Sequence, residues 1–192
     1  MKVLLFEKGL RQAMYATVKT IKSQQSKTGK KQVVITLEDD TPVFFTDREE
    51  GKGLATRIEN MKVKEGSSLL LDATKSENGN ALMGNNVAYR GNRIQMKDGE
   101  NDIFIIVSGW TQKRDWGDGN LGFSVPLYNR ETKSDEWVTV NMFASNENTA
   151  AARSLDAKTV GIVANSYRER EWEKDGKKGV DKSYIATSVV AL

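Results

Sequence analysis

The order of the predicted elements constrains the fold most, because the same order occurs twice along the chain. Short stretches rich in β-branched and aromatic residues indicate strands, and clusters of Gly, Asn, Asp and Lys separate them. The second half runs through three strands, a helix at 148–155 and two further strands. The first half repeats this order, with strands at 14–22, 32–38, 42–46, 68–74 and 81–89 around a helix carrying Leu54, Ile58 and Met61.

A helix between the third and fourth strands is typical of the five-stranded Greek-key barrel called the OB-fold. The stretches that follow the two predicted helices, 64–73 and 155–164, are also similar to each other. We therefore expect an all-β chain of two tandem OB-fold barrels with one short helix per barrel. The expected domains are a diverged N-terminal barrel at 1–95, a polar linker at 96–102 and a C-terminal barrel at 103–192.

The residue types that are missing restrict the chemistry. The 192 residues include no Cys and no His, which excludes disulfides, thiolate nucleophiles, imidazole catalysis and metals held by Cys or His. No glycine-rich nucleotide-binding loop is present either. Adjacent carboxylates occur at 39–40 and 49–50, but such pairs are more typical of solvated turns and helix starts. We expect no catalytic residue, no metal and no small-molecule cofactor.

The net charge of +3 and the pI near 9.0 are compatible with a polyanionic partner if the positive residues gather on one face. No apolar run approaches the length needed to cross a bilayer. The apolar stretch at the start is interrupted by Glu7 and Lys8, too early for a signal peptide. We expect a cytoplasmic protein that does not bind a membrane.

The strand predicted at 137–143 alternates between two kinds of side chain. Its aliphatic residues would face the core. The opposite face would then carry an aromatic ring at each end and two polar residues between them: Trp137, Thr139, Asn141 and Phe143. A monomer has no packing reason to expose two rings there, whereas single-strand binders use such rings because every base offers a π-face.

A second aromatic and basic stretch lies at 168–172. With a period of two, Arg168, Arg170 and Trp172 share one face, and a guanidinium can pair with phosphate or stack on a base. The turn at 173–179 predicts a long exposed hairpin that carries Lys174 and Lys177.

These residues also have structural interpretations. Trp137 and Phe143 could pack against the other half of the chain or against a second subunit. The two arginines alternate with Glu169 and Glu171, which could be their cross-strand ion-pair partners.

The remaining aromatic residues give weaker signals. Trp110 and Trp116 lie near the first strand of the second half and the turn after it, and Trp110 could belong to the core. In the first half, Phe44 and Phe45 are adjacent, so one of them must point outward.

The second half resembles the bacterial single-stranded-DNA-binding protein family. The resemblance rests on the segments 137–143, 158–164, 167–172 and 184–190 and covers most of 103–192. It implies base stacking by Trp137, Phe143 and Trp172 and a basic groove at Arg168 and Arg170. The family has another stacking Trp at the end of the second strand, where this chain has Tyr128. The full candidate set for nucleic-acid binding is Trp110, Tyr128, Trp137, Thr139, Asn141, Phe143, Arg168, Arg170, Trp172, Lys174 and Lys177.

The chain departs from this family in two respects. Family members usually carry a disordered tail with an acidic end that recruits partner proteins, whereas this sequence stops at 190–192, so we expect no such recruitment. The extra N-terminal half resembles the two-barrel members, which work as homodimers, and this implies a homodimer or a higher homo-oligomer. The size and the missing tail suit a plasmid- or phage-borne version.

The sequence therefore predicts a sequence-tolerant single-stranded-DNA-binding protein that protects single strands in replication, recombination or repair. One alternative is a protein-interaction or oligomerisation module that uses the same aromatic face. Another is an RNA-binding protein, which would rely on the same stacking physics.

Overall fold

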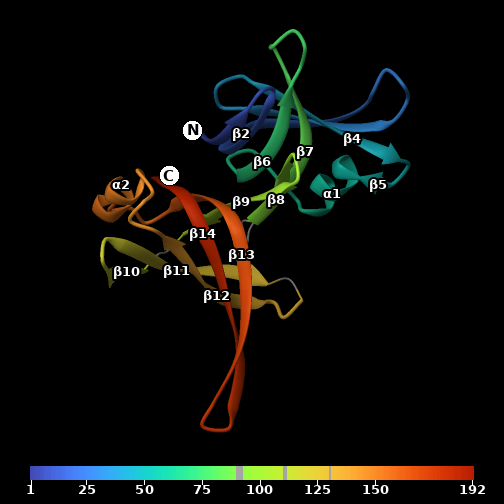
Figure 1. The fold of residues 1–192 in the computed structure, drawn as a ribbon. Coiled ribbons are helices and arrows are strands. Elements are labelled where there is room, and N and C mark those ends of the chain that lie inside the picture. Colours follow the sequence, from blue (N-terminus) through green and yellow to red (C-terminus); the bar gives the residue numbers. More distant parts are fainter. Residues whose placement is uncertain (90–92, 110–111, 130) are drawn as a thin grey trace. The chain divides into compact units, whose positions relative to one another are not determined.

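The computed structural model describes every residue except 90–92, 110–111 and 130 (Figure 1). The chain divides into two compact units, Met1–Arg90 and Gly91–Leu192, which we call unit 1 and unit 2. No helix in the described ranges is both long and apolar enough to cross a bilayer.

Unit 1 is a closed five-stranded barrel with two further strands, β1 and the two-residue β5. Its elements are β1 (Lys2–Lys8), β2 (Arg11–Gln25), β3 (Lys31–Leu37), β4 (Pro42–Glu49), β5 (Lys52–Gly53), α1 (Leu54–Asn60), β6 (Ser68–Lys75) and β7 (Leu82–Ala88). The ring runs β2-β3-β4-β7-β6 and closes by pairing of β6 with β2. Only the β4–β7 contact in this ring is parallel, and α1 lies between the third and fourth barrel strands in the sequence. This is the OB topology that the element order predicts.

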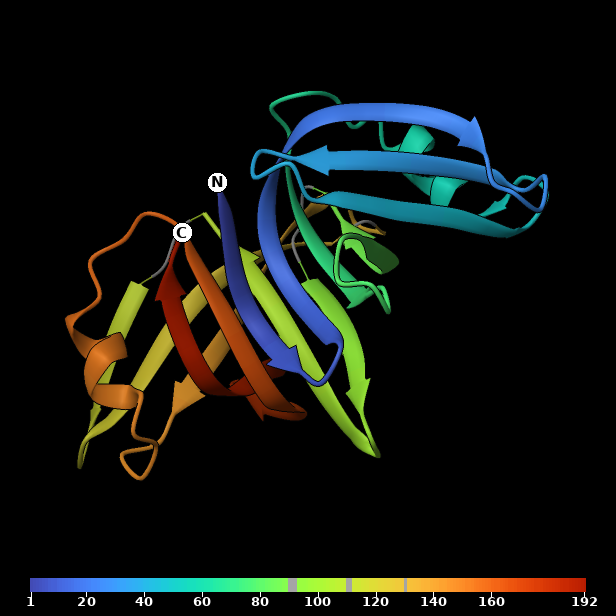
Figure 2. The ribbon, with the colours of Figure 1, turned by 90° about the horizontal axis from the view of Figure 1, so that it is seen from above.

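Period-two alternation decides which residues fill the barrel of unit 1. On β3, Val33, Ile35 and Leu37 are fully buried in the core, so Gln32 and Val34 face outward. The neighbouring strands β2 and β4 pair with β3 along its length and lie beside it (Figure 2). The three strands therefore present one continuous outer surface.

A carboxylate on β4 fixes the start of α1. Asp47 is buried and accepts hydrogen bonds from the backbone N–H of Thr56 at 3.1 Å and from its hydroxyl at 2.5 Å. Gly53 precedes the helix with φ 157°, and a Cβ there would lie 2.6 Å from Asp47 Oδ1. The close approach of strand and helix therefore requires glycine at this position.

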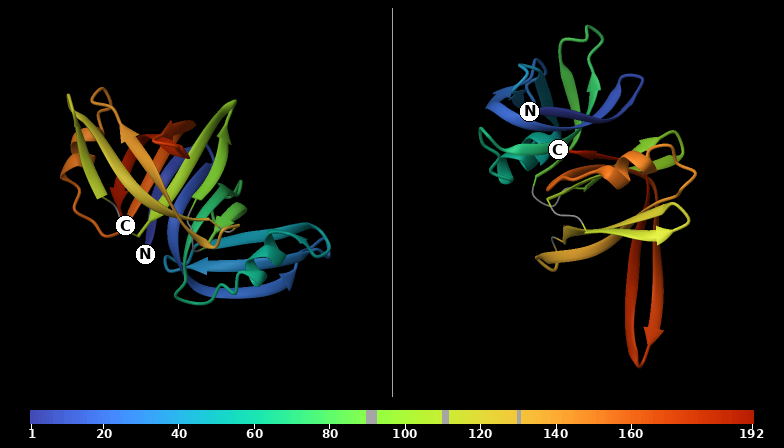
Figure 3. Two further views of the ribbon diagram at one scale, coloured as in Figure 1. Left: turned by 90° about the horizontal axis from the view of Figure 1, so that it is seen from below. Right: turned by 90° about the vertical axis from the view of Figure 1, so that its left-hand side faces the viewer.

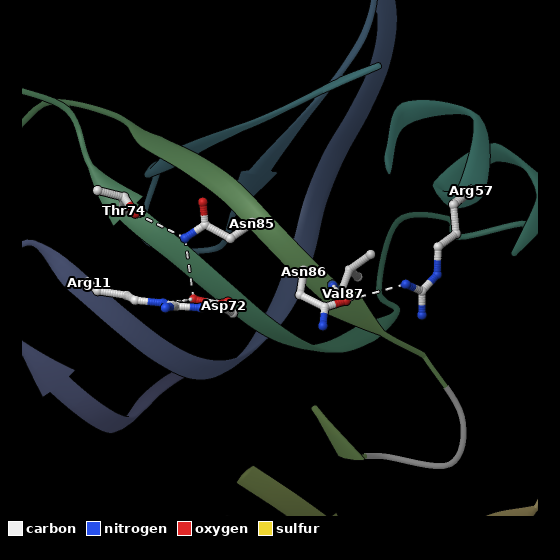
Figure 4. Close-up of polar contacts among 7 residues, drawn as sticks. All are labelled: Arg11, Arg57, Asp72, Thr74, Asn85, Asn86 and Val87. Carbon is white, nitrogen blue, oxygen red and sulfur yellow. Dashed lines mark hydrogen bonds and ion pairs between the residues drawn. The ribbon is translucent and has the colours of Figure 1, made fainter. Parts of the chain in front are cut away.

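A polar cluster ties three strands of unit 1 together (Figure 4). Arg11 on β2 pairs with the buried Asp72 on β6 through Nε–Oδ1 and Nη2–Oδ2 distances of 3.0 and 2.8 Å. Asn85 on β7 donates to Asp72 at 3.3 Å and to Thr74 at 2.9 Å. The bidentate arginine compensates the buried charge, so the cluster has a structural role.

Unit 2 repeats the topology of unit 1. Its elements are β8 (Arg93–Asp98), β9 (Asn101–Ser108), β10 (Gln112–Gly117), β11 (Asn120–Asn129), β12 (Ser134–Met142), α2 (Thr149–Ser154), β13 (Val160–Lys174) and β14 (Lys177–Ala191). The sheet order is β10-β11-β12-β14-β13-β9-β8, with a parallel β12–β14 contact. β9 pairs with β13, and β10 pairs with β11. The consecutive strands β9 and β10 together therefore occupy the position of β2 in unit 1, which pairs with both β6 and β3. The predicted fold class, all-β with two OB-like barrels and one short helix in each, is confirmed.

Each barrel is preceded in the sequence by an additional strand that the element order did not predict. β1 forms a hairpin with β2, and β8 forms a hairpin with β9. The segment 96–102, expected as a linker, therefore falls inside the β8–β9 hairpin of unit 2. Ile94 and Met96 alternate with polar residues and are buried, which is why this short polar segment forms a strand.

Unit 2 carries a long hairpin. β13 and β14 have 15 residues each and continue together past the other strands of the unit (Figures 1 and 3). The turn consists of Asp175 and Gly176, with φ of 53° and 74°, and Lys174 pairs with Lys177 across it. Positive φ at both positions is typical of the type I′ turn that joins long twisted hairpins.

Candidate nucleic-acid interface

β12 has one buried face and one exposed face. Val138, Val140 and Met142 lie in the core, as their alternation predicts. Trp137 and the two polar residues after it point the other way, and the Trp137 side chain is 53% exposed. The aliphatic and aromatic sets of β12 therefore lie on opposite faces of the sheet.

The neighbouring strand β11 extends this exposed surface. Residues paired directly across antiparallel strands point to the same side. Pro126 lies opposite Trp137, and Ser124 lies opposite Thr139. Tyr128 is exposed on the same side of β11, two residues beyond Pro126, and is a diagonal neighbour of Trp137.

The β13–β14 hairpin continues the surface on the other side of β12. Thr139 pairs with Ser183 on β14, and Ser183 pairs with Arg168 on β13. Three side chains from three strands therefore lie in one row on one face. We call the face made by the outward residues of β10–β14 the outer face of unit 2.

The hairpin places most of its basic residues on one side and the glutamates of β13 on the other, although Asp181 lies opposite Arg170 on the basic side. On β13 and at the start of β14, the side that continues the outer face carries Arg168, Arg170, Trp172, Lys174 and Lys177. The other side of β13 carries Glu169, Glu171 and Glu173. The basic residues and the tryptophan therefore share a face with the exposed rings of β12 and β11.

The glutamates are not the cross-strand partners of the two arginines. Arg168 lies opposite Ser183 and Arg170 opposite Asp181, whereas Glu173 pairs with Lys178 at 3.3 Å on the other side. Within the part of the chain that the structure describes, neither arginine makes an ion pair. Arg168 therefore faces a hydroxyl, whereas Arg170 shares the outer face with the carboxylate of Asp181.

Two exposed tryptophans lie flat over glycines of the neighbouring strand. A Cβ on Gly179 would lie 2.5 Å from Trp172 Cζ2, and a Cβ on Gly122 would lie 1.7 Å from Trp116 Nε1. Each ring therefore packs one side on a backbone without a side chain, while its exposed fraction remains large, at 39% for Trp172 and 55% for Trp116. Trp116 is not among the candidate residues selected from the sequence. The signal that could have found it is a Trp and a Gly on either side of the Asp118–Gly119 turn.

Phe143 directly follows β12. Its side chain is exposed, and its carbonyl accepts hydrogen bonds from the backbone N–H of Asn146 at 2.9 Å and from the hydroxyl of Thr149 at 2.7 Å. These bonds hold the backbone of Phe143 between the end of β12 and the start of α2. Trp110, also selected from the sequence, lies outside the described residues.

An aromatic cluster anchors the base of the hairpin in the barrel. Tyr184 is fully buried, 4.8 Å from the ring of Tyr167 and 5.3 Å from that of Phe104 between centroids, and its hydroxyl accepts a hydrogen bond from Arg93. Burial, followed by a hydrogen bond to Glu169, raises the pKa of the Tyr167 hydroxyl well above its usual value. Both tyrosines therefore stay neutral, and the hairpin base is held by packing.

The described residues contain no group of three or more acidic side chains that could hold a metal ion. The outer face instead offers rings, cations, hydroxyls and amides, together with the carboxylates of Asp135 and Asp181. These groups can stack, pair with anions and form hydrogen bonds, and none of them is a nucleophile with an adjacent base.

Two of three comparisons with known proteins find no match, and the third finds solved structures of low similarity. No family model matches the chain, and no curated protein matches it. Two solved structures of the single-stranded DNA binding protein from Thermus aquaticus align with 95% of this chain: a deletion mutant at 10% identity over 93% of its length and the wild-type protein at 9% over 92%. The TM-score is 0.30 for both, so the OB topology rests on the strand pairings of the chain itself.

Proposed function

We propose that unit 2 binds single-stranded DNA on its outer face without strong preference for base sequence. The observation that carries this proposal is the register across β11, β12, β14 and β13. It brings exposed aromatic rings and arginines without ion-pair partners onto one continuous face.

Unpaired bases stack on the rings of this face. Trp137, Phe143, Trp172 and Tyr128 are all exposed on it or at its edge. Stacking tolerates any sequence, because every base has a π-face, and it requires bases that are not already stacked in a duplex.

The cations of the hairpin neutralise phosphates. Arg168, Arg170 and Lys174 are separated by even numbers of residues on β13, so successive outward side chains of this strand lie about 6.6 Å apart. Such a row can follow the phosphate backbone of an extended DNA strand. Lys177 adds a fourth positive charge at the turn. Thr139 and Asn141, between Trp137 and Phe143, can form hydrogen bonds with bases or sugars.

In this proposal the protein covers and protects single strands and catalyses no reaction. Its cellular role is the protection of single strands in replication, recombination or repair, in the cytoplasm. The lack of His and Cys in the whole sequence supports a binding function over catalysis.

The test is fluorescence anisotropy of a labelled dT 30-mer, with unlabelled duplex DNA and the matching rU 30-mer as competitors, at several salt concentrations. We expect tight binding that weakens with salt and poor competition by the duplex. Competition by rU equal to that by dT would redirect the proposal to RNA. No binding to any of the three at low salt would mean that the rings contact a protein.

A further inference from the structure

The outer face of unit 1 carries a hydrogen-bonded row of amide and hydroxyl groups. Gln24 on β2 donates to Gln32 on β3 at 2.8 Å, and Gln32 donates to Thr46 on β4 at 2.9 Å. The row crosses the three adjacent strands of Figure 2. We call these three residues the amide row.

A parallel row beside it is apolar and includes a ring. Phe45 is buried in the barrel, so Phe44 points outward, as the adjacency of the two residues requires. Phe44 pairs with Val34 on β3 and with the exposed Met83 on β7. Phe44 and Thr46 are two residues apart on β4, about 6.6 Å, so a base on the ring could reach the amide row with its edge.

A groove on this face joins the two rows and is bordered by positive charge. Its lining includes the amide row and Phe44 together with the side chains of Lys27, Lys30 and Arg48. The one carboxylate in this lining, Asp47, is buried and bound to Thr56. An adjoining hollow, which Lys30 and Arg48 also line, carries Glu49 and Glu50, so a polyanion meets fewer carboxylates at the end of the groove near Phe44.

We propose that this groove is a second single-strand site, and that it discriminates between bases where unit 2 does not. Stacking alone barely distinguishes bases, whereas hydrogen bonds to base edges do. As the amides are oriented here, the hydroxyl of Thr46 accepts from Gln32 and keeps its own proton to donate. Gln24, at the exposed end of the row, retains its carbonyl oxygen and a second N–H for a base.

The test compares the affinities of the full chain for labelled dT, dC and dA 15-mers by anisotropy. The variant Gln32→Leu/Thr46→Val removes two members of the amide row with little change of volume. Gln95→Leu, on the exposed side of β8 in unit 2, is the matched control. We expect the ratio between the tightest and weakest oligomer to fall on the order of fivefold in the double variant and to stay constant in the control. Base stacking within the free dA oligomer affects its binding to wild type and to every variant equally, so it cancels when their ratios are compared.

An unchanged ratio in Gln32→Leu/Thr46→Val would overturn the inference. If that variant does not fold, Gln24→Leu at the exposed end of the row gives the same comparison. The variant Trp137→Ala/Trp172→Ala separates the two proposals. It should lower the affinity for all three oligomers. It should also increase the ratio between the tightest and weakest oligomer, because unit 1 then contributes a larger share of the binding. Unchanged affinity in that variant would count against the proposed function alone.

Discussion

The outer faces of the two units occupy the same position in the same topology and carry different chemistry. In unit 2 the face has exposed tryptophans laid over glycines, with arginines beside them. In unit 1 the equivalent strands carry the amide row, with Phe44 as the ring beside it. The barrel therefore determines where side chains can meet a strand, and the outward residues determine what they can recognise.

The difference has a local structural cause. Gly179 and Gly122 leave room for a large ring to lie on the neighbouring strand. In unit 1 the outward positions of β2, β3 and β4 hold side chains that form hydrogen bonds with one another across the strands. A flat ring suits stacking, whereas an oriented amide suits an edge-on contact with a base.

The largest expected effect is that of removing both rings. In the variant Trp137→Ala/Trp172→Ala, affinity for oligo-dT should fall at least about 30-fold, since each stacked base contributes about 1–3 kcal/mol in single-strand-binding proteins. Anisotropy measures the affinity, and circular dichroism shows whether the barrel remains folded. If affinity falls less than threefold while the barrel remains folded, stacking on these rings does not distinguish the outer face of unit 2 from that of unit 1.

The second test uses the separation of charge on the hairpin. Arg168→Ala/Arg170→Ala should weaken oligo-dT binding about tenfold, with each exposed charge contact contributing about 0.7 kcal/mol. The slope of log affinity against log salt should fall by about 1.4, because two phosphate contacts are lost. Lys178→Ala, on the opposite side of the same hairpin, is the control. An equal loss in the control would show that net charge, and not the face, governs binding.

A smaller effect is expected from displacing a ring that remains present. Gly179→Thr places a Cβ where the indole of Trp172 lies and should move that ring off the strand. Affinity for oligo-dT should fall about threefold to fivefold, with a change in the emission of the protein. Val180→Thr, the next residue on the opposite face, should change neither. Full affinity in Gly179→Thr would mean that the position of the ring on the glycine is not needed.

The last and smallest expected effect is on the stability of unit 1, where Asp47 has a structural role. Burial alone would raise the pKa of its carboxyl, but hydrogen bonds from Thr56 and Ala55 and the charge of Lys31 outweigh it and lower the pKa. A lowered pKa means that the carboxylate stabilises unit 1 above about pH 4 and loses this contribution as pH falls further.

Asp47→Asn should therefore lower the melting temperature at pH 7 by on the order of 5 °C and have a smaller effect at pH 3. Thermal circular dichroism at both pH values measures this, with exposed Asp156→Asn as the control. A difference between wild type and Asp47→Asn that is the same at both pH values would contradict the assigned role of the charge.

The sequence was sufficient for the parts of the fold that depend on local pattern. The alternation at 137–143 predicted which face of β12 is buried, because a strand has a period of two. The position of one helix between the third and fourth strands predicted the OB topology in both halves.

Register and partner strands were not predictable in the same way. Which residue of β14 lies opposite Arg168 depends on the register between β13 and β14, and no local pattern determines this. β8 was missed because its two buried residues lie among polar ones in a segment that has the composition of a linker. Trp116 was missed because its packing partner, Gly122, lies on another strand.

The most direct test of the central claim uses the tryptophans themselves. All four lie in the second half of the sequence, so intrinsic fluorescence reports on unit 2 and not on unit 1. Titration with oligo-dT, duplex DNA and the matching RNA should give strong quenching by oligo-dT that salt weakens, and none by the duplex. Tight binding of oligo-dT without any quenching would show that the strand does not lie on the outer face of unit 2.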